Sequence, residues 1–166
     1  MFTGTFVHML DSSGRFVMPQ EIRQELGNDF IITKALGCLC VFKQEHAAKL
    51  QTEISNLGTS PLAMLLNPDV SRLYRHFFSE MVITNPDKQN RVQLTAEHRR
   101  YAEIGQTLIV MGCGEYVEIW GTEAINKFRN QNESVESLFS AGAALLPNFK
   151  QGTADESAGI SHTSTI

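Results

Sequence analysis

Short apolar runs separated by turn residues dominate the first third of the chain. Runs of this length that are rich in β-branched and aromatic residues, and bounded by Gly, Pro, Asn or Asp, predict β-strands. Proline suits the first position of a helix, so Pro19 predicts a short helix from 19 to about 26. A further helix is expected from about 45 to 54. The predicted strands span residues 5–10, 15–18, 30–33 and 38–42.

The same order of elements recurs later in the chain. Asp11, Arg15 and Arg23 are matched 76 positions further on (87 − 11) by Asp, Arg and Arg, and beyond residue 30 the displacement becomes 78 (108 − 30). Such self-similarity is typical of a duplicated structural unit. The second copy is expected to contain strands at 81–84, 91–94, 107–111 and 116–120, with helices at 96–102 and 122–131.

The segments outside the two copies have different patterns. Leucine, valine and phenylalanine recur at helical spacing before residue 79, which predicts one or two amphipathic helices. Beyond residue 150 the chain is rich in Ser, Thr, Gly and Ala, which predicts disorder. The expected organisation is a first repeat at 1–56, a helical linker at 57–79, a second repeat at 80–133, an apolar segment at 134–147 and a disordered tail at 148–166.

The composition is that of a soluble globular protein. The 166 residues are 42% hydrophobic and 19% charged, which allows a substantial core and excludes wholesale disorder. No apolar stretch is long enough for a membrane helix and no signal peptide is visible, so a cytoplasmic location is expected. The formal net charge is 14 − 18 = −4, so binding to a polyanion would have to rest on local clusters of Arg and Lys.

Enzyme chemistry is not indicated. The sequence has no phosphate-binding loop, no nucleophile elbow and no cluster with metal-ligand spacing, so no cofactor, metal or catalytic residue is expected. The three cysteines, Cys38, Cys40 and Cys113, are an odd number without C-x-x-C spacing. We interpret Cys38 and Cys40 as buried thiols on one strand face.

Each copy carries a D-x-x-x-R turn. In the first turn Asp11 precedes Arg15, and in the second Asp87 precedes Arg91. An Asp that opens a turn accepts backbone hydrogen bonds and braces an Arg, so one interpretation is a structural lock within a hairpin that pairs the flanking strands. The other is a contact element, because Arg binds guanine O6 and N7 or bridges phosphate oxygens. The pattern alone leaves both open.

The order and spacing of these residues resemble the MraZ family. The motif F-x-G-x-x-x-H-x-L-D-x-x-G-R-x-x-x-P-x-x-x-R, the second D-x-x-x-R turn and a Glu-Ile-Trp sequence at 118–120 carry the resemblance over about residues 1–140. In this chain the first motif comprises Phe2, Gly4, His8, Leu10, Asp11, Gly14, Arg15, Pro19 and Arg23.

The resemblance implies an α+β, mainly β fold of tandem AbrB-like domains, in which swapped-hairpin β-barrel repeats form an intramolecular pseudo-dimer. It also implies a cytoplasmic, nucleoid-associated transcriptional regulator, acting as a repressor of the division and cell-wall gene cluster. Such a protein would bind promoter direct repeats in double-stranded DNA as a ring-shaped homo-oligomer. The D-x-x-x-R turns would contact DNA. The expected DNA-binding residues are Asp11, Ser13, Arg15, Asp87, Lys88, Gln89, Arg91 and Arg99.

Basic residues near the turns have two interpretations. Arg99 and Arg100 beside the second turn, and Arg23 and Lys34 beside the first, are candidates for phosphate contacts. Alternatively, Arg23 and Arg99 pair with nearby acids such as Glu21 or Glu97.

A second function also stays open. A ring could act as a non-catalytic assembly protein that recruits a protein partner through the helices expected at 45–54 and 122–131. A DNA affinity that falls steeply with salt would separate the two functions.

Overall fold

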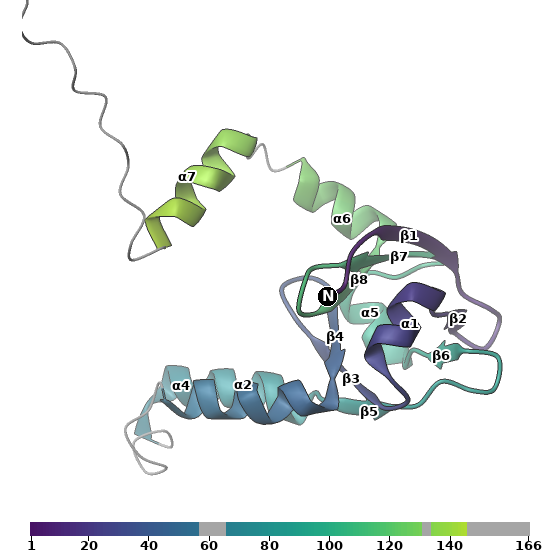
Figure 1. Cartoon of the computed structure of the whole chain (residues 1–166), viewed down its shortest axis with the longest axis horizontal. Helices are drawn as coiled ribbons and strands as arrows, with labels where there is room; N and C mark the ends of the chain where they lie inside the picture. Colours follow the sequence, from purple (N-terminus) through teal and green to yellow (C-terminus); the bar gives the residue numbers. More distant parts are fainter. Residues whose placement is uncertain (57–65, 131–133, 146–166) are drawn as a thin grey trace, which may run out of the picture. The chain divides into compact units, whose positions relative to one another are not determined.

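The computed structural model describes residues 1–56, 66–130 and 134–145 (Figure 1). The chain divides into two compact units, Met1–Arg129 and Asn130–Ile166. Residues 57–65 of the helical linker expected at 57–79 lie outside the described residues, and so does the whole of the disordered tail expected at 148–166.

The first copy of the repeat contains four strands and two helices, and all the elements predicted for it are present. The helices are α1 (Gln20–Leu26) and α2 (Gln44–Asn56). Each predicted boundary lies within about two residues of the observed one. The strands are β1 (Thr5–Met9), β2 (Arg15–Val17), β3 (Phe30–Lys34) and β4 (Leu39–Lys43).

The second copy repeats this order after α4 (Pro68–Ser79), one of the helices expected between the copies. Its helices are α5 (Ala96–Tyr101) and α6 (Thr122–Arg129). The second unit contributes α7 (Val135–Leu145). The strands are β5 (Val82–Thr84), β6 (Arg91–Gln93), β7 (Thr107–Gly112) and β8 (Val117–Gly121). The expected α+β, mainly β fold is therefore confirmed.

Six strands form one antiparallel sheet in the order β1-β7-β8-β4-β3-β5. The first strand of each copy pairs with the third strand of the other: β1 with β7, from Thr5↔Met111 onward, and β5 with β3, from Thr84↔Phe30 onward. Strands β2 and β6 form a separate two-stranded sheet. The two copies are thus interleaved through their backbone hydrogen bonds.

The prediction that residues 5–10 and 15–18 pair with each other as a hairpin is wrong. The chain does reverse at 11–14, where the Gly14 N–H donates to the Asp11 carbonyl. However, β1 takes its partner from β7 and β2 takes its partner from β6. Turn residues determine the local reversal, whereas a distant part of the chain satisfies the strand hydrogen bonds on either side of it.

Residues from both copies fill a common core. Alternate side chains of β4 and β8 point to the same side of the sheet, and Leu39, Val41, Val117 and Ile119 are fully buried there. Phe16 of β2 belongs to the same cluster. None of the helices in the described part of the chain is long and apolar enough to cross a membrane.

Candidate functional site

The two D-x-x-x-R turns have the same internal geometry. In the first, Asp11 Oδ1 accepts hydrogen bonds from the backbone N–H groups of Ser13 and Arg15, each at 2.9 Å. Asp11 Oδ2 accepts from Arg15 Nε, also at 2.9 Å. In the second, Asp87 accepts in the same way from Gln89 N at 2.8 Å, Arg91 N at 3.0 Å and Arg91 Nε at 2.7 Å. Each aspartate therefore both shapes its turn and orients its arginine.

One position in each turn needs a left-handed backbone. Gly14 has φ +76° and its counterpart Asn90 has φ +59°. Glycine adopts this conformation without steric cost, and asparagine is among the side chains that tolerate it best. The two different residues therefore support the same turn.

The turn geometry also keeps both aspartates ionised. The backbone hydrogen bond from Arg15 is the largest cause that holds the pKa of Asp11 below its ordinary value of 3.8, and the Arg15 side chain adds to it. The backbone hydrogen bond from Arg91 does the same for the pKa of Asp87. Both side chains are therefore carboxylates at neutral pH and hold their arginines as ion pairs.

The two turns lie side by side at the end of the first unit away from α2 and α4 (Figure 1). Arg15 Nη1 of one turn lies 4.0 Å from Asp87 Oδ2 of the other. The side chains of Arg15 and Arg91 are each 31% exposed, so neither is buried inside the protein. The pairing that defines a turn lock is therefore present, and both guanidinium groups stay accessible to a ligand.

The other predicted residues of the turns are exposed. Ser13, Lys88 and Gln89 all lie at the tips with their side chains open to solvent. A residue that the sequence did not indicate also contributes: Gln93 of β6 donates from Nε2 to the Ser13 carbonyl oxygen at 2.8 Å. This bond ties the first turn to the strand that follows the second turn.

Arg99 packs over the first turn. A Cβ atom placed on Gly14 would lie 3.0 Å from Arg99 Cζ, so the guanidinium group covers this part of the turn. Arg99 Nε is buried without a hydrogen-bond partner among the described residues. Arg23, its counterpart in the first copy, donates to the carbonyl oxygen of Gly27 and to Asn28 Oδ1. The alternative pairing of these two arginines with Glu21 or Glu97 is thus not found in the described residues.

The expected phosphate contact from Lys34 is wrong. Lys34 is only 8% exposed, and its Nζ lies 2.8 Å from Glu80 and 2.7 Å from Glu97. It also lies 5.4 Å from the ring centroid of Tyr101. All three partners come from beyond α4, so the ion pairs connect β3 to the second copy and leave Lys34 no role in an exposed site.

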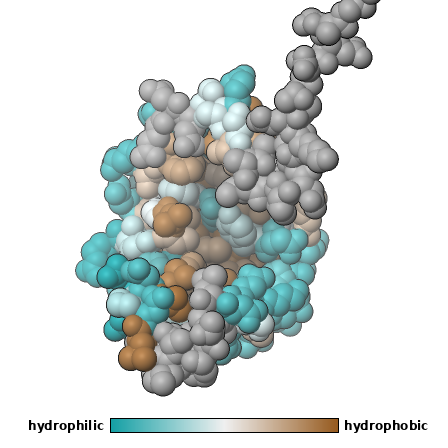
Figure 2. Space-filling model, turned by 90° about the vertical axis from the view of Figure 1, so that its left-hand side faces the viewer, coloured by the Kyte–Doolittle hydropathy of each residue, from teal (hydrophilic) through white to brown (hydrophobic). Residues whose placement is uncertain are grey.

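A second candidate site is a groove on the face of the sheet opposite the core. Its floor contains Cys40, Phe42, Glu118 and Trp120, which alternate along β4 and β8 with the buried core residues. The groove has a volume of about 740 Å³. Figure 2 shows hydrophobic residues gathered in a hollow of the molecule, with hydrophilic residues around it.

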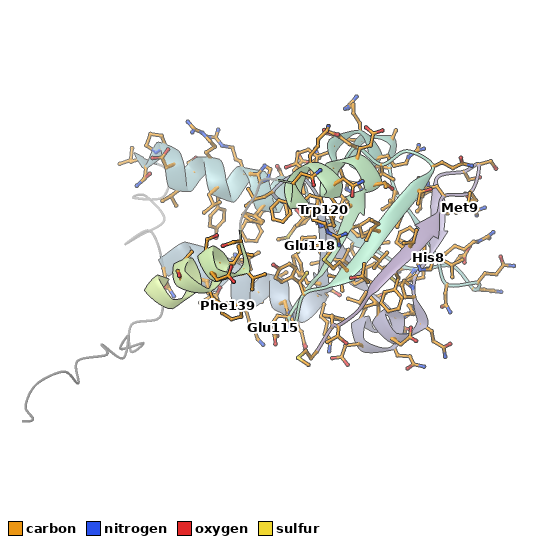
Figure 3. The ribbon with its side chains drawn as sticks, turned by 90° about the horizontal axis from the view of Figure 1, so that it is seen from above. His8, Met9, Glu115, Glu118, Trp120 and Phe139 are labelled. Atoms are coloured by element: carbon orange, nitrogen blue, oxygen red, sulfur yellow. The ribbon has the colours of Figure 1, made fainter. Side chains whose placement is uncertain are left out.

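Glu118 is held in place on the groove floor. Trp120 Nε1 donates a 2.7 Å hydrogen bond to Glu118 Oε2, and Figure 3 shows the two side chains together on β8. These are two of the three residues of the Glu-Ile-Trp sequence. The intervening Ile119 points into the core, so the alternation of the strand explains the spacing of this motif.

The three cysteines are free thiols. Cys38 is buried as expected, whereas Cys40 is half-buried. Burial is the largest cause that raises the pKa of Cys40 to about 12 and that of Cys113 to about 11. The thiols of Cys40 and Cys113 are therefore protonated at neutral pH and are poor nucleophiles. The described residues contain no group of three or more side chains suited to hold a metal ion.

The fold and the turns define a duplicated α+β protein in which two interleaved copies hold matching Asp–Arg turns side by side. A family model described as "MraZ protein, putative antitoxin-like" matches residues 77–146. A protein named Transcriptional regulator MraZ from Carboxydothermus hydrogenoformans is 36% identical over 78% of this chain and 87% of its own length.

Proteins with the same name are similar over comparable or greater lengths. The one from Lactiplantibacillus plantarum is 33% identical over 79% of this chain and 89% of its own. The one from Heliobacterium modesticaldum is 33% identical over 90% of this chain and 99% of its own. The chain belongs to the MraZ family.

Proposed function

We propose that this chain is a transcriptional regulator that binds double-stranded DNA through its two D-x-x-x-R turns. The observation that carries the proposal is the placement of Arg15 and Arg91. Each is fixed by its own aspartate, each is partly exposed, and the turns adjoin at one end of the unit. The name shared by the similar proteins, transcriptional regulator, supports the same function.

The chemistry of the turns suits DNA. A guanidinium group binds O6 and N7 of guanine through two hydrogen bonds, which is the commonest specific contact in the major groove. Asp11 and Asp87 act as positioning residues, because they reduce the rotamer freedom that each arginine would otherwise lose on binding. We assign phosphate and base-edge contacts around them to Ser13, Lys88, Gln89 and Arg99.

A net charge of −4 makes binding by a single chain weak, so several copies are needed. We propose a ring-shaped homo-oligomer that binds direct repeats upstream of a promoter, in which weak contacts add through high effective concentration. The chain then acts in the cytoplasm at the nucleoid, as a repressor of the division and cell-wall gene cluster. Residues 1–56 and 80–133 form the two repeats of an intramolecular pseudo-dimer, joined by 57–79.

The test removes both arginines. The probe is a duplex selected by the wild-type protein from a random-sequence pool, and affinity is measured by mobility shift at fixed salt. We expect the Arg15→Ala and Arg91→Ala double variant to bind at least about tenfold more weakly, since one good base contact is worth about 1–3 kcal/mol. Light scattering should give an unchanged oligomer mass.

The matched control is the Arg72→Ala and Arg75→Ala double variant, which also removes two positive charges, from exposed positions of α4. Its affinity should stay within about twofold of the wild type, and wild-type affinity should fall steeply with salt. Unchanged binding by the double variant would refute the assignment of the turns.

The groove favours a second candidate function. It is lined by residues of α2 and α6, the helices through which a non-catalytic assembly protein would recruit a partner. Under that alternative the wild-type protein assembles but has no DNA affinity that depends steeply on salt. The same salt titration therefore separates the two functions.

A further inference from the structure

The groove on the outer face of the sheet has the size of a small-molecule site. Its volume is about 740 Å³, within the range of about 300–1,000 Å³ that is usual for such pockets. Helices α2, α4 and α6 contribute Leu50, Phe77 and Phe128 to its walls. All the lining residues belong to the first unit. Most are apolar, with a few polar side chains among them, which is the composition that ligand pockets share.

Aromatic rings from five different places in the first unit line the groove. They belong to two strands, two helices and the turn between β7 and β8: Phe42, Phe77, Tyr116, Trp120 and Phe128. The rings of Trp120 and Phe128 have centroids 5.3 Å apart. Trp120 is 5% exposed in the floor, whereas Phe128 is 59% exposed at the edge. The face of an aromatic ring is electron-rich and attracts cations.

The carboxylate of Glu118 lies on the groove floor without a cation. Its neighbours across the sheet are Cys40 of β4 and Met111 of β7, which are uncharged. The hydrogen bond that it accepts comes from the neutral indole of Trp120, at 2.7 Å. Within residues 1–56, 66–130 and 134–145, no lysine, arginine or histidine forms an ion pair with it. The negative charge therefore stays available to a ligand.

The groups around Glu118 are affected by this charge. Burial is the largest cause that raises the pKa values of Cys40, Cys113 and Tyr116, and the negative charge of Glu118 is the next largest. The potential on this part of the floor is therefore negative, which favours a positively charged ligand.

The charges of the whole lining have the same sign. Glu53, Glu115 and Glu118 stand against one lysine, so the formal charge is 1 − 3 = −2 with the histidines neutral. Lys49 lies one turn of α2 from Glu53 and offsets that residue. Glu115 and Glu118 remain, and Figure 3 shows them along β8 and the turn before it. An anionic ligand would be repelled at this end of the groove.

We propose that the groove binds an organic cation with an apolar body, such as an ammonium or phosphonium ion that carries aromatic or aliphatic groups. The apolar body covers the hydrophobic walls and so removes apolar area from water. The cationic centre lies by Glu118 and the rings of Trp120 and Phe128, where a carboxylate and aromatic faces both attract it. None of the residues of the two D-x-x-x-R turns lines the groove, so this site is additional to the proposed DNA contacts.

The volume of the groove favours a compact molecule over a peptide helix. An α-helix is about 10–12 Å across and rises about 5.4 Å per turn, so about one to two turns would fill 740 Å³. A longer helix would leave most of its length outside the groove.

The fluorescence of Trp120 allows a direct test, because Trp120 is the single tryptophan of the chain. Full-length protein is titrated with tetraphenylphosphonium and, separately, with tetraphenylborate, which has the same four phenyl groups and the opposite charge. Isothermal titration calorimetry measures the same affinities independently. We expect saturable binding of the phosphonium ion and at least about tenfold weaker binding of the borate, because Glu118 attracts one ion and repels the other.

The variant Glu118→Gln removes the charge and keeps an oxygen that can accept from Trp120 Nε1. It should bind tetraphenylphosphonium at least about fivefold more weakly, without a loss of affinity for tetraphenylborate. The matched control is Glu21→Gln, at an exposed position of α1 that does not line the groove. Its affinities should stay within about twofold of the wild type, because solvent and salt screen a distant charge.

The variant Phe128→Leu tests the aromatic contribution, because leucine is apolar but has no ring. We expect about threefold weaker binding of the phosphonium ion, as for the loss of an exposed cation–π contact. Phe139→Leu makes the same change at an exposed position of α7 outside the groove lining and should have no effect.

Several results would overturn the proposal. No saturable binding of tetraphenylphosphonium to the wild-type protein would mean that there is no cation site. Equal affinities for the two ions, or an unchanged affinity in Glu118→Gln, would mean that apolar surface alone is responsible. The DNA affinity of the turn variants is independent of these results.

The same titrations identify other occupants. If Phe139→Asp raises the affinity for tetraphenylphosphonium, α7 covers the groove and the proposal is wrong. If an amphipathic helical peptide of leucine and lysine displaces the phosphonium ion and binds more tightly than it, the groove is a site for a basic helix instead.

Discussion

Arg15 Nη1 lies 4.0 Å from Asp87 Oδ2, so a residue of the first turn faces a residue of the second. Asp87 thereby neighbours two arginines, its own Arg91 at 2.7 Å and that of the other copy. The two turns consequently form one charged surface. Loss of the charge of Asp87 therefore affects both arginines.

The first prediction concerns Asp87→Asn. Asparagine still accepts the backbone hydrogen bonds through its oxygen, but the variant loses the negative charge that holds Arg91 and faces Arg15. We expect a roughly fivefold or greater loss of DNA affinity by mobility shift, with the urea midpoint of unfolding nearly unchanged because the pairs are exposed. Asp69→Asn on α4 is the control and should change neither. A large loss of stability without loss of affinity would contradict a positioning role.

The second prediction concerns acid. The pKa values of Asp11 and Asp87 are lowered in the folded protein, so their contribution to stability is fully present above the ordinary pKa of 3.8. It is lost as the pH falls from there through the lowered folded values. The Asp11→Asn and Asp87→Asn double variant should therefore show a shallower decline of Tm between about pH 5 and about pH 2 than the wild type. Parallel curves would show that the turn carboxylates do not contribute.

The third prediction concerns the left-handed turn position. Gly14→Ala should destabilise the protein by about 1–2 kcal/mol, because alanine resists φ +76° and its Cβ would press on Arg99. Asn90→Gly should be neutral or slightly stabilising, since glycine adopts φ +59° freely. Urea unfolding measures both. The control is Gly105→Ala, because a Cβ atom at residue 105 meets open space. An equal loss of stability in this control would mean that the turn conformation is not the cause of the loss in Gly14→Ala.

The fourth prediction concerns Lys34. Lys34→Met keeps the length of the side chain but leaves Glu80 and Glu97 without their cation. We expect a measurable decrease in the free energy of unfolding, which solvent moderates because the side chains of Glu80 and Glu97 are 34% and 58% exposed. Lys43→Met removes a lysine that is 29% exposed, compared with 10% for Lys34, and that pairs with Glu25 alone among the acids, so it should lower the free energy of unfolding less. Equal losses in the two variants would mean that burial does not strengthen the Lys34 pairs.

The sequence predicts the local features of this protein well. The turn at 11–15 forms as its residues require, because Asp11, Gly14 and Arg15 interact within five positions of one another. The repeated order of elements is likewise readable, since it depends on patterns within single segments. The pairing of β1 with β7 could not be predicted from the sequence, because it joins residues about 100 positions apart and no turn residue specifies it.

Contacts between distant parts of the chain also explain which parts of the site sequence reasoning missed. Lys34 looks like an available cation, but its acids lie on the loop after α4 and on α5. Gln93 looks like a solvent-facing strand residue, and yet it holds the carbonyl oxygen of Ser13. The groove is assembled from β4, β8 and three helices, so no single segment carries a signal for it.

Covalent linkage of the two copies has a consequence for symmetry. Two separate identical chains paired in this way would have to present identical turns. Here one chain supplies both, and they have diverged to Ser12 and Ser13 in one and Lys88 and Gln89 in the other. The shared end of the unit is therefore polar and neutral at one turn and basic at the other. A ligand that contacts both turns therefore has different neighbours at its two ends. Its two opposite orientations differ in binding energy, so the protein can favour one of them.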